Sequence, residues 1–359
     1  MAEIRLDKVA HSYDGGKTFA LQETSVVWDD GKAYALLGPS GCGKTTLLNI
    51  VSGLIIPSHG RIFIDGVDVT QTPTEGRNIA QVFQFPVLYD TMTVRRNLEF
   101  PLKNRKVNPE QIAIKVDKIA ELLELTDSLD VRPGKLRSDL QQIVSLGRAL
   151  VREDVAAILF DEPLTVIDQN FKWTLRSRLK KLHLRTGATI VYVTHDQTEA
   201  LTFADEVLVM KDGQLVQSGS SEELYLYPKH EFVGFFIGSP GMNFLNAEVS
   251  GSSVSIDGNA VGIAKGKIQD GSYRLGVGPE FLVPSPAGLE FTVDRIENRG
   301  VYQLAHLRIN DQKLIAKLDS DHSINKGDQV KFALDLNKSF LFHEKRMITN
   351  LSPVEKGSK

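Results

Sequence analysis

The sequence predicts an α/β domain that is followed by a smaller all-β domain. In the first part of the chain, short apolar runs alternate with amphipathic helical patterns, as in a parallel sheet covered by helices. After about residue 240 the pattern changes to short runs of β type broken by Gly, Asn and Asp, which favours a small barrel or sandwich. A Gly-Ser-Pro-Gly stretch at residues 238–241 marks this change. We therefore expect domains at residues 1–240 and 241–359.

The expected elements follow one another along the chain. Six apolar runs are the candidate strands of the first domain, at residues 34–37, 61–64, 79–82, 157–160, 189–193 and 206–210. Residues 93–150 have a mostly helical pattern, clearest at residues 111–125, which indicates a helical insertion between two halves of the sheet. The candidate strands of the second domain lie at residues 248–256, 273–277, 291–297, 303–309, 313–318 and 329–334.

Composition restricts the class of protein. The chain has 359 residues, of which 42% are hydrophobic and 24% charged, as in a soluble globular protein of two domains. A net charge of −3 gives no reason to expect nucleic acid as a partner, and the single cysteine, Cys42, fits a reducing compartment. The sequence shows no signal-peptide core and no apolar run near the ~18 residues that span a bilayer. We expect a cytoplasmic protein that reaches a membrane only through a partner.

A glycine-rich loop stands between the first expected strand and an apolar helical pattern. It consists of Gly38, Pro39, Ser40, Gly41, Cys42, Gly43, Lys44, Thr45 and Thr46. The glycines let successive backbone N–H groups converge on phosphate oxygens, toward which the following helix directs its positive end. Lys44 supplies a cation for the β- and γ-phosphates, and the Thr45 hydroxyl suits Mg²⁺. The loop predicts a P-loop NTPase sheet that binds a nucleoside triphosphate.

Two carboxylates follow a second apolar run, 156–160. Asp161 and Glu162 stand at the carboxyl end of this expected strand, the edge where open α/β sheets place their ligands. Asp161 is the expected Mg²⁺ ligand, directly or through water. Glu162 is the expected group that orients or deprotonates the attacking water. A solvated turn after a buried strand is the alternative interpretation.

Three single residues join these motifs. Gln84 ends an expected strand, where its amide can contact Mg²⁺ or the attacking water; a surface glutamine is the alternative. His195 ends another, where its imidazole can contact the γ-phosphate; a capping or buried histidine is the alternative. Tyr13 precedes the glycine-rich loop, and its ring can stack on adenine, unless it is simply a half-buried strand aromatic.

The order of these features resembles the ATPase subunits of ABC transporters. The series runs from the glycine-rich loop through Gln84, the helical insertion, Asp161 with Glu162 and Asp168 to His195, and the resemblance covers nearly the whole chain. The β-rich tail, with residues 276–280 and 340–343, looks like the oligonucleotide-fold regulatory domain of the carbohydrate-importer branch. Within that branch, residues 79–92 and 160–200 look most like one of the two ATPases of bacterial glycerol importers.

The resemblance implies partners as well as roles. Two such ATPases close head to tail over two ATP molecules, each held between one chain's phosphate loop and the other chain's signature sequence. Asp168 would then reach the partner's loop, and residues 85–97 would form part of a groove for a coupling helix. Two membrane-spanning permease subunits would supply that helix, and a solute-binding protein would act indirectly. The chain would be peripheral on the cytoplasmic face of the inner membrane.

The chain departs from the family at the signature. Where the family has Leu-Ser-Gly-Gly-Gln, residues 136–140 read Leu-Arg-Ser-Asp-Leu, and the register downstream matches without a gap. Arg137 thus replaces Ser, Ser138 and Asp139 replace Gly, and Leu140 replaces Gln, unless a shift by one places Ser138 on the serine position. Ser138 or Asp139 can still cap the helix, but Asp139 would repel a γ-phosphate, which Arg137 would partly offset. We expect a heterodimer in which a different ATPase contributes an intact signature.

Two further expectations concern function. Cys42 lies beside a helix end that should lower the pKa of its thiol and make the residue reactive, with an inert loop residue as the alternative. The whole pattern favours an ATP-hydrolysing subunit of an importer for a small polyol, with glycerol preferred. A sugar or sugar phosphate is the first alternative cargo. A switch ATPase without transport and a small-molecule kinase are more distant alternatives.

Overall fold

The computed structural model describes residues 2–352, which fall into two compact units divided between Ser221 and Glu222. The first unit contains two sheets. A six-stranded sheet has the order β10-β9-β3-β8-β7-β6, in which only β10 runs antiparallel to its neighbour, and a four-stranded antiparallel sheet has the order β2-β1-β4-β5. The strands are β1 Ile4–His11, β2 Leu21–Trp28, β3 Ala33–Leu37, β4 His59–Ile64, β5 Val67–Asp68, β6 Ile79–Val82, β7 Ala157–Asp161, β8 Ile190–Thr194, β9 Glu206–Lys211 and β10 Gln214–Gly219.

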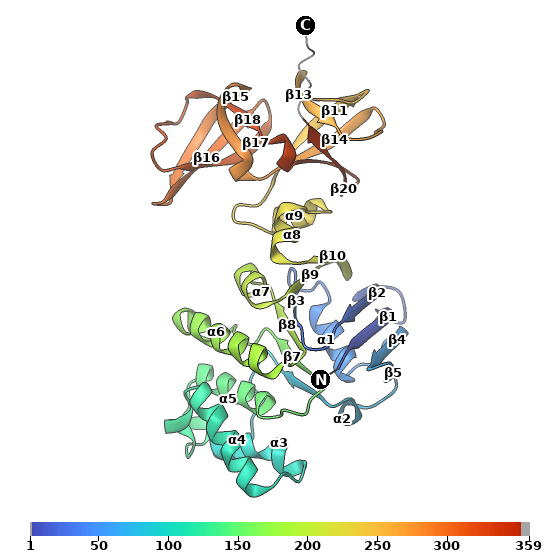
Figure 1. The fold of residues 1–359 in the computed structure, drawn as a ribbon, viewed down its shortest axis with the longest axis vertical. Coiled ribbons are helices and arrows are strands. Elements are labelled where there is room, and N and C mark those ends of the chain that lie inside the picture. The colour runs from blue at the N-terminus through green and yellow to red at the C-terminus, as the bar shows by residue number, and fades with distance from the viewer. Residues whose placement is uncertain (1, 353–359) are drawn as a thin grey trace. The chain divides into compact units, whose positions relative to one another are not determined.

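The helices of the first unit cover both faces of the six-stranded sheet (Figure 1). They are α1 Lys44–Ser52, α2 Thr74–Arg77, α3 Val94–Asn104, α4 Pro109–Leu122, α5 Ser138–Leu150, α6 Gln169–Thr186 and α7 Gln197–Phe203, with 3₁₀ turns at Thr126–Ser128 and Pro133–Lys135. The helical insertion expected at residues 93–150 is present as α3, α4 and α5. Thr93 and Asn108 begin α3 and α4, since each side chain accepts a backbone N–H of the first turn.

The alternation of side chains along the central strands explains why each face of the six-stranded sheet has its own hydrophobic core. Ile158 and Phe160 of β7 pack with the helices α3 to α6, whereas Leu159 packs with α1 and the antiparallel sheet. Because side chains alternate across a strand, a fully apolar strand can supply both cores at once. The expectation that residues 61–64 belong to the parallel sheet is wrong. They lie in β4 of the antiparallel sheet, since an apolar run of four residues does not distinguish the two.

The second unit is β-rich, as expected. Six strands close a barrel in the order β11-β12-β13-β20-β19-β14, and four form a sheet in the order β17-β16-β15-β18, all antiparallel. Residues 248–256 form a hairpin rather than one strand. The elements are α8 Ser221–Leu226, α9 Glu231–Phe236, β11 Asn243–Ser250, β12 Ser253–Ile256, β13 Asn259–Ala264, β14 Gly271–Val277, β15 Leu282–Asn298, β16 Tyr302–Ile309, β17 Gln312–Asp319, β18 Gln329–Leu334, β19 Ser339–His343 and β20 Arg346–Ser352, with 3₁₀ turns at Pro279–Phe281 and Leu336–Lys338.

The division between the units falls earlier than the expected boundary near residue 240. The segment of α8 and α9 belongs with the barrel because its backbone bonds to it: Glu231 N–H donates to Lys345 O at 2.8 Å, and Met347 N–H to Lys229 O at 3.0 Å. A composition change marks where strands begin, whereas these hydrogen bonds join two short helices to strands that come a hundred residues later. Residues 353–359 of the expected second domain lie outside the described residues.

Candidate functional site

The glycine-rich loop connects β3 to α1 and encloses the Lys44 ammonium. Lys44 is 5% exposed, and its Nζ donates to the carbonyl oxygens of Gly38 at 2.8 Å and Pro39 at 2.9 Å. These neutral acceptors hold the charge in the middle of the loop without pairing it to a carboxylate. The ammonium is therefore placed to meet an anion that enters the loop.

Two glycines of the loop are required by close packing. A Cβ on Gly38 would lie 2.3 Å from the carbonyl oxygen of Met210. A Cβ on Gly43, which has φ +100°, would lie 2.4 Å from the carbonyl oxygen of Ala20. Both contacts are too short for any side chain, so the loop can pass between β9 and the chain before β2 only as glycine.

Thr45 and Asp161 meet at the base of the loop. The Thr45 hydroxyl donates to Asp161 Oδ1 at 3.1 Å, and Asp161 is 5% exposed. Burial is the main reason why the pKa of this carboxyl lies above its usual value, with the charge of Glu162 adding to it. No cluster of three or more His, Cys, Asp or Glu within residues 2–352 is arranged to hold a metal ion. One hydroxyl and one carboxylate fit a Mg²⁺ ion that keeps waters and nucleotide phosphates as its other ligands.

Glu162 is the point where several expected residues meet. Its Oε2 lies 3.1 Å from His195 Nδ1 and 3.5 Å from Gln84 Nε2. The three side chains come from the ends of β7, β8 and β6, which are neighbours in the sheet. Glu162 has φ 45°, a left-handed conformation that is uncommon for a non-glycine residue and is often found at functional sites.

One contact at Glu162 was not expected. The Thr165 hydroxyl donates to the same Oε2 at 3.4 Å. Its position three residues after Glu162, in the turn that follows β7, is the signal that could have indicated it. The turn brings the backbone back toward the strand end, as the hydrogen bond from Thr165 N–H to Glu162 O at 3.3 Å shows.

A buried carboxylate supports the strand end that carries His195. Glu199 of α7 is 4% exposed, and its Oε2 accepts hydrogen bonds from Thr194 Oγ1 at 2.8 Å and Tyr192 Oη at 3.1 Å. Asp196 begins α7 by accepting the Glu199 N–H at 3.1 Å, while its own N–H donates to Thr194 Oγ1 at 2.9 Å. His195 therefore sits between two residues that are fixed by this network. Sequence reasoning did not identify Glu199.

Tyr13 lies close to the glycine-rich loop. Its hydroxyl is 3.2 Å from Thr46 Oγ1, its side chain is 65% exposed, and its ring meets that of His11 edge-on at 4.6 Å. An exposed ring beside the loop leaves a face open for a planar ligand. The alternative of a half-buried strand aromatic does not fit this exposure.

The start of α5 differs from the expected cap. Arg137, rather than Ser138 or Asp139, occupies the N-cap position, and it makes no side-chain capping bond. Asp139 lies two residues past the cap: its Oδ1 accepts the N–H of its neighbour Leu140 at 2.8 Å, and its Oδ2 pairs with Arg137 Nη2 at 2.9 Å. The Arg137 side chain is 79% exposed. The offset of one charge by the other, expected from the sequence, takes the form of a local ion pair.

The expectation for Cys42 is wrong. The thiol is buried, 4% exposed, and desolvation raises its pKa, although the nearby Lys44 ammonium opposes the shift. The helix end favours the thiolate only where the sulfur is also accessible to water. Packing of the loop over the thiol therefore outweighs the positive end of α1.

The two remaining expected features lie on either side of this centre. Asp168 precedes α6, and its carbonyl accepts the Lys172 N–H at 2.9 Å. In the segment 85–97, Phe85 is 69% exposed. The buried Asn97 side chain accepts a hydrogen bond from the backbone N–H of Tyr89 at 2.9 Å and donates one to the carbonyl oxygen of Tyr89 at 3.0 Å. A cavity of about 180 Å³ lies beside Val87, Pro101 and Arg148. The segment therefore exposes an aromatic ring beside a cavity that has both apolar and basic lining residues.

Known proteins share this arrangement. The sequence profile of the ABC transporter family matches residues 21–165. The chain is 40% identical to the sn-glycerol-3-phosphate import ATP-binding protein UgpC of Jannaschia sp. over 91% of this chain and 94% of that protein. The chain belongs to the ABC transporter family. It is an ATP-hydrolysing subunit that uses ATP with Mg²⁺.

Other relatives agree with this assignment. The oligosaccharide import ATP-binding protein MsmX of Bacillus subtilis is 36% identical, and the trehalose/maltose import ATP-binding protein MalK of Thermococcus litoralis is 37% identical, each over 95% of this chain and 98% of its own length. The solved dimer of a bacterial ABC transporter cassette matches with a TM-score of 0.56 and 28% identity, over 60% of this chain and 98% of that one. Within residues 2–352 of the ATPase subunit, no helix is both long and apolar enough to cross a bilayer.

Proposed function

We propose that this ABC ATPase drives uptake of a small polyol, with glycerol as the favoured cargo. It would work on the cytoplasmic face of the membrane with two permease subunits, a solute-binding protein and a second, different ATPase. The relatives named above carry glycerol phosphate, oligosaccharides or trehalose and maltose in their names, and another is named for transport of sulfoquinovosyl glycerol. A sugar or sugar phosphate is accordingly the second candidate cargo.

The residues of the site have separate roles in this proposal. Lys44 and the loop N–H groups bind the phosphates, Thr45 and Asp161 hold Mg²⁺ with Gln84 nearby, and Tyr13 stacks on the base. When bound, ATP supplies the phosphoanhydride bond that hydrolysis breaks, and Mg²⁺ neutralises much of the charge of the phosphates. Glu162 orients the attacking water and accepts its proton. His195, which uses Nδ1 for Glu162, has its other ring nitrogen available for the γ-phosphate.

The proposal of a second, different ATPase rests on the contrast between two regions of this chain. Lys44, Asp161 and Glu162 make the contacts that we assign to binding and hydrolysis, whereas residues 136–140 present an Arg137–Asp139 ion pair where the family has serine and glycines. Loss of such transition-state contacts costs about 10²–10³ in rate. The chain would therefore supply the hydrolytic half of one site and would need a partner with an intact signature.

Uptake by cells tests the function. Cells that express Glu162→Gln in place of the natural chain should take up labelled glycerol at least about 10²-fold more slowly, because the acceptor for the water proton is lost. Glu121→Gln, an exposed glutamate on α4, is the matched control and should leave uptake unchanged. If glycerol uptake persists while uptake of glycerol 3-phosphate or a disaccharide is lost, glycerol is not the cargo.

A further inference from the structure

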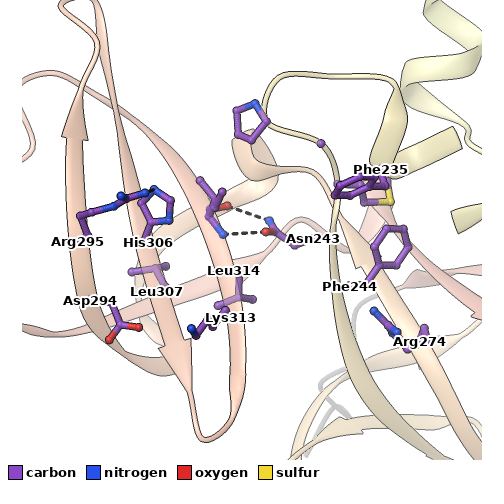
Figure 2. A pocket seen from close by; sticks show the side chains of 14 residues that line it. Phe235, Asn243, Phe244, Arg274, Asp294, Arg295, His306, Leu307, Lys313 and Leu314 are labelled. Carbon is purple, nitrogen blue, oxygen red and sulfur yellow. Dashed lines mark hydrogen bonds between the residues drawn. The ribbon is translucent and has the colours of Figure 1, made fainter. Parts of the chain in front are cut away.

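The C-terminal unit contains a cavity that the ATPase mechanism does not use. Its volume is about 760 Å³, within the range of small-molecule sites, and it is lined by residues of α9, the chain before β11, the barrel and the four-stranded sheet (Figure 2). Its floor is apolar: Leu307 and Leu314 are 1% and 2% exposed. Phe235 and Phe244 add two aromatic rings at its wall.

The cavity has a rigid frame. The amide of Asn243 makes two hydrogen bonds with the backbone of Ile315, donating to its carbonyl at 2.9 Å and accepting its N–H at 2.8 Å (Figure 2). This joins β11 of the barrel to β17 of the sheet. Barrel and sheet also share one hydrophobic core, in which Leu245 and Val249 pack in the same cluster as Phe291 and Leu314. The two walls of the cavity thus belong to one packed body.

The charges around the cavity are of two kinds. Asp294 is paired with Arg308 at 3.1 Å, and Glu297 pairs with Arg295, Arg299 and His306, so both of these carboxylates already have cationic partners. Arg274, on β14 of the barrel, and Lys313, on β17 of the sheet, form no ion pair with a carboxylate among the described residues, and the Arg274 guanidinium lies 5.5 Å from the Phe244 ring (Figure 2). The unbalanced charge is therefore positive, and it lies beside apolar surface.

We propose that this cavity binds a small organic phosphate. Two cations without carboxylate partners match the double charge of a phosphomonoester better than a single carboxylate, and Arg offers the paired donors that phosphate accepts. The apolar floor and the two phenylalanines then contact the body of the ligand, either the C–H face of a polyol or sugar or the plane of a base. Inorganic phosphate or an uncharged sugar would satisfy only one half of the cavity.

Calorimetric titration of the whole chain tests the proposal. Saturating Mg²⁺–ADP fills the phosphate loop, and the probes are glycerol 3-phosphate, glucose 6-phosphate and AMP, with inorganic phosphate and glucose as comparisons. We expect at least one ester to bind one site per chain at least about 10-fold more tightly than inorganic phosphate or glucose does. The ester that binds most tightly shows whether the organic part of the ligand is a polyol, a sugar or a nucleoside. Failure of all three esters at millimolar concentration, or equal binding of inorganic phosphate or glucose, overturns the proposal.

Variants locate the site. R274Q with K313Q should weaken binding of the preferred ester at least about 10-fold, whereas K326Q, an exposed lysine in a loop of the same unit, should not change it. All are surface changes, and melting temperatures check that each variant is folded. Unchanged binding in the double variant would place the ligand elsewhere and contradict the assignment. The titration needs no partner or permease, so its result is independent of the cargo and of the second ATPase.

Discussion

At the residue scale, Asp161 combines a functional position with a cost in stability. Its carboxyl is buried against Thr45, and desolvation holds its pKa above the usual value of 3.8. A carboxyl whose folded pKa is raised binds more protons in the native than in the unfolded state between those two pKa values. The free energy of unfolding therefore falls as pH rises through that window, and the penalty persists at neutral pH.

Asp161→Asn should accordingly stabilise the nucleotide-free protein. We expect a higher melting temperature than the natural chain at pH 7, a difference that shrinks as pH falls toward 4, because the amide has no charge to desolvate and still accepts the Thr45 hydroxyl. The extra stabilisation that Mg²⁺ adds to bound ATP should be lost. Asp127→Asn, at an exposed position, is the control. A variant that is less stable than the natural chain at pH 7 would contradict this account of burial.

Cys42 gives a second prediction at this scale. Since the thiol is 4% exposed and burial raises its pKa, a thiol reagent at pH 8 should modify the native protein at least about 10-fold more slowly than the protein in denaturant. The chain has no other cysteine, so the colour released by the reagent reports this residue alone. Equal rates in the two states would show that the loop does not protect the thiol.

At the element scale, the side chains to which we assign catalysis stand at the ends of β6, β7 and β8, and their positions depend on what holds those ends. Glu199 of α7 fixes Thr194, the residue before His195, through a buried hydrogen bond of 2.8 Å. Lys172 of α6 lies 3.8 Å from its other oxygen. We therefore infer that Glu199 is a positioning residue for His195 rather than a catalytic one.

Replacement of Glu199 distinguishes a role in positioning His195 from a role in the stability of the fold alone. Glu199→Ala leaves two buried hydroxyls without an acceptor, which should lower the ATPase kcat of the assembled transporter about 10-fold with little change in KM. Glu199→Gln retains an acceptor oxygen and should recover most of the rate. If both variants lose stability but keep the natural kcat, the network supports only the fold.

The sequence was informative where a motif has fixed geometry and less so elsewhere. Because the strands of a parallel sheet end at one edge, the sequence predicts that four features lie together: the glycine-rich loop, Asp161 with Glu162, Gln84 and His195. Glu199 could not be predicted in this way, since nothing in a helical pattern tells which carboxylate will be buried. The prediction that Ser138 or Asp139 caps α5 was also wrong, because the Asp139 carboxylate binds the Leu140 N–H and the Arg137 side chain instead.

At the scale of the whole molecule, one chain carries both the proposed phosphate site around Lys44 and the altered signature at residues 136–140. The β-rich unit adds a separate cavity with unpaired cations. In the proposed function this asymmetry matters because each ATPase would complete the site of its partner. The central claim is that residues 136–140 do not close productively on ATP held by a second copy of this chain.

Analytical ultracentrifugation of the Glu162→Gln protein with Mg²⁺–ATP tests that claim most directly. The variant should bind ATP without hydrolysing it and remain a monomer. The same protein with the signature restored by Arg137→Ser, Ser138→Gly, Asp139→Gly and Leu140→Gln should form an ATP-dependent dimer. A stable ATP-dependent dimer of the Glu162→Gln protein with its own signature would contradict the claim that this chain needs a different partner.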